Sequence, residues 1–273
     1  MSSAPRPFDL IATDLDGTLL RDDHTVSPRT RRTLSAVQAV GAQHIVVTGR
    51  SARWTRPTLD AIGYTGLAVC GQGGQLYDAG AHRLVTSVTL DRQVAALALA
   101  KAEAEVGPMA VAVVQDGLEG DVLFDRTYDM PSAGERLAAP EPVADLAELW
   151  AKPLSRVLVQ HKLLSDDELA AAVGAAASGL VTVVLSGQGF VELLPLGLSK
   201  ATGLKLASAR LGTARDRTVA FGDMPNDIPM FGWAGHAVAM ANAHTELKAV
   251  ADEITLSNEE DGVALALERI FQL

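Results

Sequence analysis

The chain has 273 residues, 48% of them hydrophobic, which is enough for one large domain or two modest ones. Its formal net charge of -10 disfavours a general nucleic-acid binder, because such proteins gather Lys and Arg against phosphates. The apolar runs are of strand length, and residues 1–9 lack the pattern of a secretory signal. Cys70 is the only cysteine, so no internal disulfide can form. We therefore expect a soluble cytoplasmic protein that binds neither nucleic acid nor membrane.

Short apolar runs alternate with helical segments at the start of the chain, and the alternation resumes after Lys200. A helix is expected to begin at Pro28, where Ser27 supplies a capping hydroxyl, and to end near Gly41. Alternation of this kind is typical of βαβ units in a parallel sheet. The strands expected in these two parts are residues 8–13, 44–47, 67–70, 218–221 and 237–240.

The middle of the chain has a different pattern, in which hairpin-like strands are grouped with a few helices. One helix begins at the capping box formed by Ser165 and Glu168. We predict an α/β fold with a Rossmann-like parallel-sheet core and an inserted α+β cap domain. The core would be discontinuous, residues 1–85 and 196–273, and the cap would be residues 86–195.

Two carboxylates, Asp14 and Asp16, follow the first predicted strand. Residues two apart point the same way in an extended chain, so both could face one site. The carboxyl ends of strands in an open α/β sheet are where ligands bind. Neighbouring carboxylates repel unless a cation or a proton stabilises them. The pair, followed by Gly17 and Thr18, therefore indicates a functional site, although an Asp-Gly pair alone would predict only a turn.

Two further motifs follow predicted strands. At Thr48-Gly49-Arg50, a hydroxyl, a glycine amide and the start of a helix could all face a phosphate, although Arg50 could equally pair with a neighbouring acid.

The segment from Gly222 to Asp227 holds two carboxylates, Asp223 and Asp227, with Asn226 beside the second. A helix cap explains only one of the two acids. Oxygen ligands of this kind suit Mg²⁺. Lys200, just before a predicted helix, is typical of a solvated lysine when considered alone.

Together these motifs resemble, in order and along the whole chain, those of the haloacid dehalogenase superfamily of phosphotransferases. The inserted middle segment is similar to the α+β cap of its class IIB, Cof-like branch, and so is the tail from Ala239 to Ala243. One departure is Gln72-Gly73-Gly74, which stands where this branch usually has Asn-Gly-Ala, and it leaves the role of Gln72 open.

The resemblance implies a Mg²⁺-dependent phosphatase that hydrolyses small phosphorylated metabolites, such as sugar phosphates. Asp14 would attack phosphorus and become an aspartyl-phosphate, and Asp16 would protonate the leaving oxygen and then activate water. The metal would be held by Asp14, Asp223 and the backbone carbonyl of Asp16, with Asp227 as a further ligand or as an orienting group. The residues implied to position the phosphate or the nearby substrate are Lys200, Thr18, Thr48, Gly49 and Asn226.

The cap is expected to choose the substrate. Candidate contacts are His161, within a strand predicted at residues 156–163, and Arg126 and Arg136. A phosphomutase of the same superfamily is an alternative that the core motifs do not separate from a phosphatase. A non-catalytic phospho-acceptor is disfavoured by the cap and by Asp16. We expect a small phosphorylated metabolite as the partner, and a monomer or small homo-oligomer.

Overall fold

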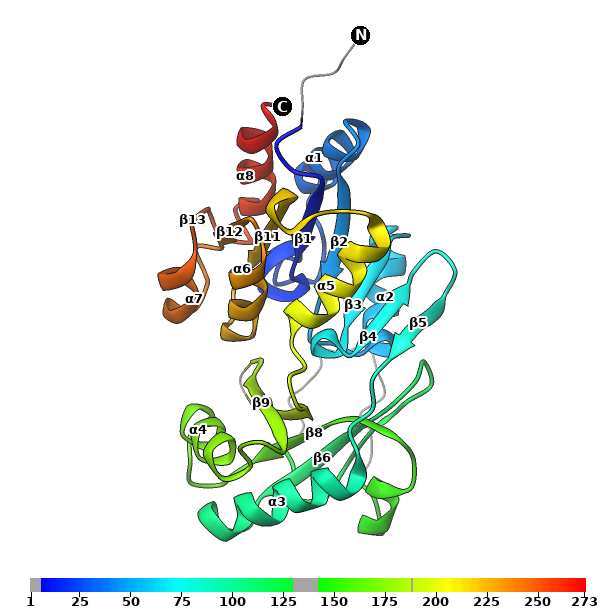
Figure 1. Cartoon of the computed structure of the whole chain (residues 1–273), viewed down its shortest axis with the longest axis vertical. Helices are drawn as coiled ribbons and strands as arrows, with labels where there is room; N and C mark the ends of the chain where they lie inside the picture. Colours follow the sequence, from blue (N-terminus) through cyan, green and yellow to red (C-terminus); the bar gives the residue numbers. More distant parts are fainter. Residues whose placement is uncertain (1–5, 130–141, 188) are drawn as a thin grey trace. The chain divides into compact units, whose positions relative to one another are not determined.

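The chain divides into two compact units in the computed structural model, which describes residues 6–129, 142–187 and 189–273. The first unit combines Met1–Val85 with Ser199–Leu273, and the second is Thr86–Leu198. Each unit contains one sheet (Figure 1). Among the described residues, no helix combines the length and the apolar character needed to cross a bilayer.

The sheet of the first unit has eight strands, and most of its neighbouring strands are parallel. Strand β4 runs antiparallel to β3. The predicted parallel sheet is thus confirmed. In sheet order the strands are β13 (Glu253–Ile254), β12 (His236–Ala239), β11 (Thr218–Gly222), β1 (Leu10–Thr13), β2 (Gln43–Val47), β3 (Leu67–Cys70), β4 (Gln75–Asp78) and β5 (Arg83–Ser87).

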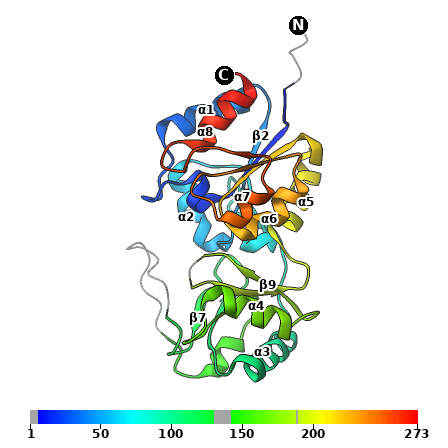
Figure 2. The ribbon, with the colours of Figure 1, turned by 90° about the vertical axis from the view of Figure 1, so that its left-hand side faces the viewer.

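Helices cover both faces of this sheet (Figure 2). Because both faces are covered, the central strands β1 and β11 are buried along their whole length, as expected for parallel strands. Helices α1 (Pro28–Ala39), α2 (Ala52–Ile62) and α8 (Gly262–Phe271) lie on one face, and α5 (Lys200–Leu211), α6 (Ile228–Trp233) and α7 (Thr245–Val250) on the other. The predicted cap of α1 is present, because the Ser27 hydroxyl accepts a hydrogen bond from the Thr30 amide at 3.0 Å.

The register of the central strands brings three loops together. Thr13 at the end of β1 pairs with Val46 of β2 and Phe221 of β11. Parallel strands that end level with one another release their loops at one edge of the sheet. The loops at this edge begin at Asp14, Thr48 and Asp223.

The second unit is a five-stranded antiparallel sheet with two long helices packed on one face. Its core there includes Val157 and Val159, while Leu158 packs with Phe124 and Tyr128 on the opposite face. In sheet order its strands are β7 (Val122–Phe124), β6 (Ala110–Gln115), β8 (Leu154–Gln160), β10 (Val191–Pro195) and β9 (Val181–Leu185), and its helices are α3 (Arg92–Val106) and α4 (Asp166–Ala176).

The predicted C-terminal end of one strand, residues 156–163, is wrong. Strand β8 stops at Gln160, so His161 lies beyond the strand rather than within it. The reason is local: the His161 ring accepts hydrogen bonds at Nδ1 from the amides of Leu163 and Leu164, at 3.2 and 3.1 Å. These bonds close a turn that leads into α4. Arg136, another candidate contact, lies outside the described residues.

Single helical turns connect several of the longer elements. They are Leu15–Leu19, Gly71–Gly73, Leu146–Trp150, Arg215–Arg217 and Pro225–Asp227.

Candidate active site

The loop after β1 places Asp14 against the loop after β11. The Asp14 amide donates to the Phe221 carbonyl at 2.9 Å, which continues the pairing of the two strands. Gly17 in the same loop has a φ of +67°, and a Cβ there would lie 2.4 Å from Asp223 Oδ2. Only glycine therefore allows both this backbone conformation and this close approach.

Three buried carboxylates form the centre of the site. Asp14, Asp223 and Asp227 each offer an oxygen, and these oxygens all lie within 4.8 Å of one another. Burial raises the pKa of Asp14 well above its ordinary value, and the charges of Asp227 and Asp223 add to the effect. Burial, with the charge of Asp227, likewise raises the pKa of Asp223 to about 6. Carboxylates held this close are stabilised by a cation, and their hard oxygen atoms fit Mg²⁺.

Lys200 supplies one positive charge to this cluster. Its side chain is 1% exposed, and its Nζ lies 3.0 Å from Asp14 Oδ1 and 2.7 Å from Asp227 Oδ1. Burial opposes the charge of Lys200, but the two carboxylates outweigh burial and raise its pKa above the ordinary value. One ammonium does not balance three carboxylates, so the site still has an excess of negative charge when all are ionised.

Asp227 and Thr18 hold the loop of Asp223 in place. Asp227 Oδ1 accepts from Lys200, and Asp227 Oδ2 accepts from the amides of Asp223 and Met224, both at 3.1 Å. The Thr18 hydroxyl donates to Asp223 Oδ1 at 2.9 Å. Both oxygens of Asp227 thus have partners inside the protein, and the hydroxyl of Thr18 is directed at Asp223.

Asp16 lies outside the carboxylate cluster and pairs with Arg50. The Arg50 Nε donates to Asp16 Oδ2 at 2.7 Å, and Nη2 donates to Oδ1. The side chain of Asp16 is 45% exposed, in contrast to that of Asp14 at 8%. The structure therefore brings Asp14, Asp223, Asp227 and Lys200 together. Asp16 is not part of this cluster and forms an ion pair with Arg50.

Thr48 and Gly49 form the next loop. Thr48 is buried, and its hydroxyl accepts from the Arg50 amide at 3.1 Å. A Cβ at Gly49 would lie 2.5 Å from Gln72 Nε2, so the glycine makes room for the Gln72 side chain.

Asn226 is buried and has one unsatisfied atom. Its Nδ2 donates to Gln72 Oε1 at 3.1 Å, while its Oδ1 has no hydrogen-bond partner among the described residues. Leaving a buried acceptor without a donor costs about 1–3 kcal/mol. An unsatisfied acceptor on the residue next to Asp227 is the kind of group that can bind a ligand.

Sequence reasoning missed the residues that brace the first loop from the C-terminal segment. Asn242 Nδ2 donates to the Gly17 carbonyl at 2.8 Å, and Asn242 Oδ1 accepts from the Asn258 amide at 3.1 Å. The His244 amide donates to the Asp223 carbonyl at 2.8 Å. The only available signal was the tail from Ala239 to Ala243, which resembles the family without indicating a contact.

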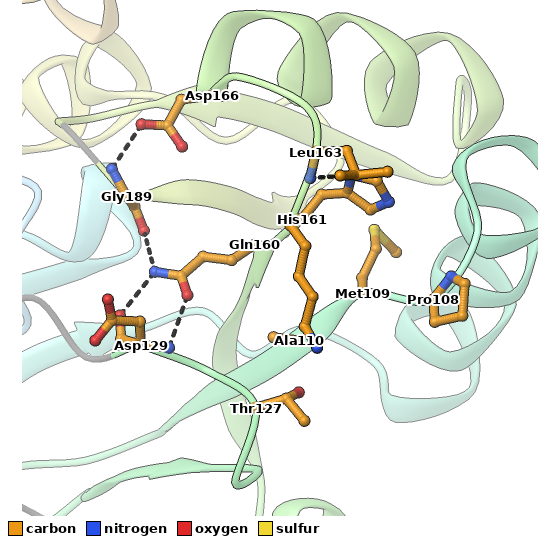
Figure 3. Close-up of a pocket in the computed structure, with 11 residues that line it drawn as sticks. Pro108, Met109, Ala110, Thr127, Asp129, Gln160, His161, Leu163, Asp166 and Gly189 are labelled. Atoms are coloured by element: carbon orange, nitrogen blue, oxygen red, sulfur yellow. Dashed lines mark hydrogen bonds between the residues drawn. The ribbon is translucent and has the colours of Figure 1, made fainter.

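The second unit contains a cavity of about 660 Å³ beyond the end of β8 (Figure 3). His161 and Lys162 line it. The Gln160 side chain spans part of its wall, accepting from the Asp129 amide and donating to the Asp129 carbonyl, both at 2.8 Å. Arg126 is exposed and does not line this cavity.

Comparison with known proteins agrees with this fold. The family model for haloacid dehalogenase-like hydrolases matches residues 11–267. The Bacillus subtilis (strain 168) protein YitU, a 5-amino-6-(5-phospho-D-ribitylamino)uracil phosphatase, is 30% identical over 279 residues, covering 98% of this chain and 99% of YitU.

Solved structures show the same fold. BT1666 of Bacteroides thetaiotaomicron, from a study of phosphatases of this superfamily, has a TM-score of 0.79 and 26% identity, covering 98% of each chain. The subclass IIB sugar phosphatase BT4131 has a TM-score of 0.74 at 19% identity, covering 96% of this chain and 98% of that one, a likeness of fold.

The chain therefore belongs to the haloacid dehalogenase-like hydrolases, with the fold of subclass IIB. Within that family it is a phosphatase, which confirms the resemblance seen in the motifs.

Proposed function

We propose that this phosphatase requires Mg²⁺ and hydrolyses small phosphate monoesters through an aspartyl-phosphate on Asp14. The observation that carries the proposal is the buried cluster of three carboxylates with Lys200 between two of them. A nucleophilic carboxylate, a lysine and a set of oxygen ligands at one strand edge are the parts that phosphoryl transfer through a covalent intermediate needs.

In the first step Asp14 attacks phosphorus, so that a bond from its carboxylate oxygen to phosphorus forms while the ester oxygen leaves with its electron pair. Lys200 holds Asp14 Oδ1 at 3.0 Å and orients the nucleophile. Asp14, Asp223 and the backbone carbonyl of Asp16 would hold Mg²⁺. When bound, the metal supplies the positive charge that allows an anionic ester to approach these carboxylates.

The carboxyl of Asp16 gives its proton to the leaving oxygen and then takes a proton from the water that attacks the aspartyl-phosphate. Both of its oxygens are paired with Arg50 in the structure. Asp16 therefore releases at least one oxygen from Arg50 before it serves as the acid, and its exposed position leaves room for that rotation.

The remaining residues act on the phosphate and on the loops around it. Lys200 would neutralise charge on the phosphate, and the Thr48 hydroxyl and the Gly49 amide would position its oxygens. Asn226 offers its unsatisfied Oδ1 to a donor on the ligand or to water. Thr18 contributes through Asp223, to which its hydroxyl donates. Asp227 orients Lys200 and the Asp223 loop, because both of its oxygens already have partners.

We assign catalysis to the core, residues 1–85 and 196–273, and substrate choice to residues 86–195. His161 is the candidate contact in that segment with support from geometry, since it lines the cavity. Small phosphorylated metabolites, including sugar phosphates and the phosphoribityl compound in the name of YitU, are the first substrates to test.

The experiment measures free phosphate released from a panel of such esters, with Mg²⁺ and with excess EDTA. Release that requires Mg²⁺ and is lost in Asp14→Asn, with an unchanged circular-dichroism spectrum, supports the proposal. Substantial release by Asp14→Asn would remove Asp14 as the nucleophile. An isomerised phosphate ester formed without free phosphate would instead indicate a phosphomutase.

A further inference from the structure

Gln72 occupies a backbone position that is costly for its residue type. It is 1% exposed, and its φ of +57° lies in the left-handed region, which residues with a side chain rarely adopt. Two backbone hydrogen bonds hold it there. The backbone N–H of Gln72 donates to the Thr48 carbonyl at 3.2 Å, and the backbone N–H of Gly71 donates to the Arg50 carbonyl at 2.7 Å. The turn that carries Gln72 is thus fastened to the loop after β2.

From its turn after β3, the Gln72 side chain reaches to the loop after β11. It passes against Gly49, where a Cβ would lie only 2.5 Å from Gln72 Nε2. Its Oε1 accepts from Asn226 Nδ2 at 3.1 Å. The buried side-chain amide of Gln72 therefore connects its own turn to the loop after β11, through a bond between residues 154 positions apart in the chain.

This contact fixes the orientation of the Asn226 amide. Because Nδ2 donates to Gln72, Asn226 Oδ1 is the end left without a partner among the described residues. An amide that is held at one end and unsatisfied at the other is prepared for a ligand. An asparagine in place of Gln72 would be one methylene shorter and would not span the same gap.

We infer that Gln72 is a positioning residue. It turns Asn226 Oδ1 toward a hydrogen-bond donor of the substrate or of water, and it fixes the backbone of Thr48 and Gly49 for the phosphorylated end of the substrate. The inference rests on the proposed function. Gln72 acts through these neighbours and does not touch the reacting atoms.

A double-mutant cycle tests this coupling. It compares kcat/KM of Gln72→Ala, Asn226→Ala and the double variant, with Mg²⁺ and an ester that the wild type hydrolyses. We expect each single variant to lose roughly 10- to 100-fold, and the double variant to lose no more than about 2-fold beyond the worse single one. Losses that multiply, or an Asn226→Ala variant with wild-type kcat/KM, would overturn the inference.

Gln72→Asn separates positioning from stability. Asparagine tolerates a positive φ better than glutamine or alanine, which offsets part of the stability lost with the Asn226 contact, so the melting temperature of Gln72→Asn should lie above that of Gln72→Ala. Its kcat/KM should nevertheless fall as in Gln72→Ala. Gln272→Asn is the matched control, because Gln272 also has a positive φ, of 56°, but lies at the exposed C-terminal end.

The outcomes of the two tests are distinguishable. Full activity in Gln72→Asn overturns the role of Gln72 alone. A wild type that releases no phosphate from any ester overturns the proposed function.

Discussion

Replacing Lys200 with methionine removes an ammonium group that is buried against two of the three carboxylates of the site. The Nζ lies 3.0 Å from Asp14 and 2.7 Å from Asp227, and at these distances the gross Coulomb attraction is on the order of 10 kcal/mol at an effective dielectric constant of about 20. Desolvation of the buried charges offsets much of it. Removing one partner of a buried ion pair typically costs about 3–5 kcal/mol, because the remaining charge is left uncompensated.

The assay is urea unfolding of Lys200→Met, in EDTA and in Mg²⁺, together with phosphate release. We expect a loss of about 3–5 kcal/mol of unfolding free energy in EDTA and a fall in kcat of at least about 100-fold. Lys205→Met is the matched control, since Lys205 is on the same helix but exposed, and it should change stability by less than about 0.5 kcal/mol. Wild-type stability and turnover in Lys200→Met would refute the electrostatic reasoning.

Three other variants probe the loops around this cluster. Burial raises the pKa of Asp223 to about 6, so the folded protein holds this proton more tightly than the unfolded chain, and the resulting stabilisation is lost as pH rises through about 6. In urea unfolding at pH ~7.5 with EDTA, Asp223→Asn should therefore be more stable than wild type by on the order of 1–3 kcal/mol. It should also lose any stabilisation by Mg²⁺. A variant less stable than wild type in EDTA would contradict this. Gly17→Ala should abolish thermal stabilisation by Mg²⁺, because the added Cβ would meet Asp223. Gly63→Ala is the control: Gly63 also has a positive φ but has no atom within 4 Å of the added Cβ, so the variant should lose only about 1–2 kcal/mol of unfolding free energy. Asn242→Ala should lower kcat roughly 10-fold by releasing the Gly17 carbonyl, and an unchanged kcat would show that this contact does not position the loop.

The candidate site residues that come directly after strands could be predicted from the sequence. Asp14, Thr48 and Asp223 each come directly after an apolar run, and parallel strands deliver their ends to one edge. Lys200 could not be found this way, because a single lysine before a helix gives no sign that it is buried. Its role was indicated only by the resemblance of the whole set of motifs to a family.

Contacts between residues far apart in the sequence could not be predicted either. The bond between Gln72 and Asn226 and the bond between Asn242 and Gly17 join residues 154 and 225 positions apart, and no local pattern encodes them. His161 was misplaced for a local reason. Leu163 and Leu164 resume the apolar pattern after Gln160, but the His161 ring accepts hydrogen bonds from two backbone amides where the strand ends. The sequence left open whether Arg50 pairs with a neighbouring acid, and in the structure its partner is Asp16.

The most direct test of the account is to look for the phosphoryl group on Asp14. The enzyme is mixed with Mg²⁺ and a hydrolysed ester, quenched in acid during turnover, digested, and examined by mass spectrometry. A nucleophilic Asp14 should give one phosphoryl group on the peptide that contains this residue, and none in Asp14→Asn. Phosphate release without any such peptide, or with the phosphoryl group on another residue, would contradict it.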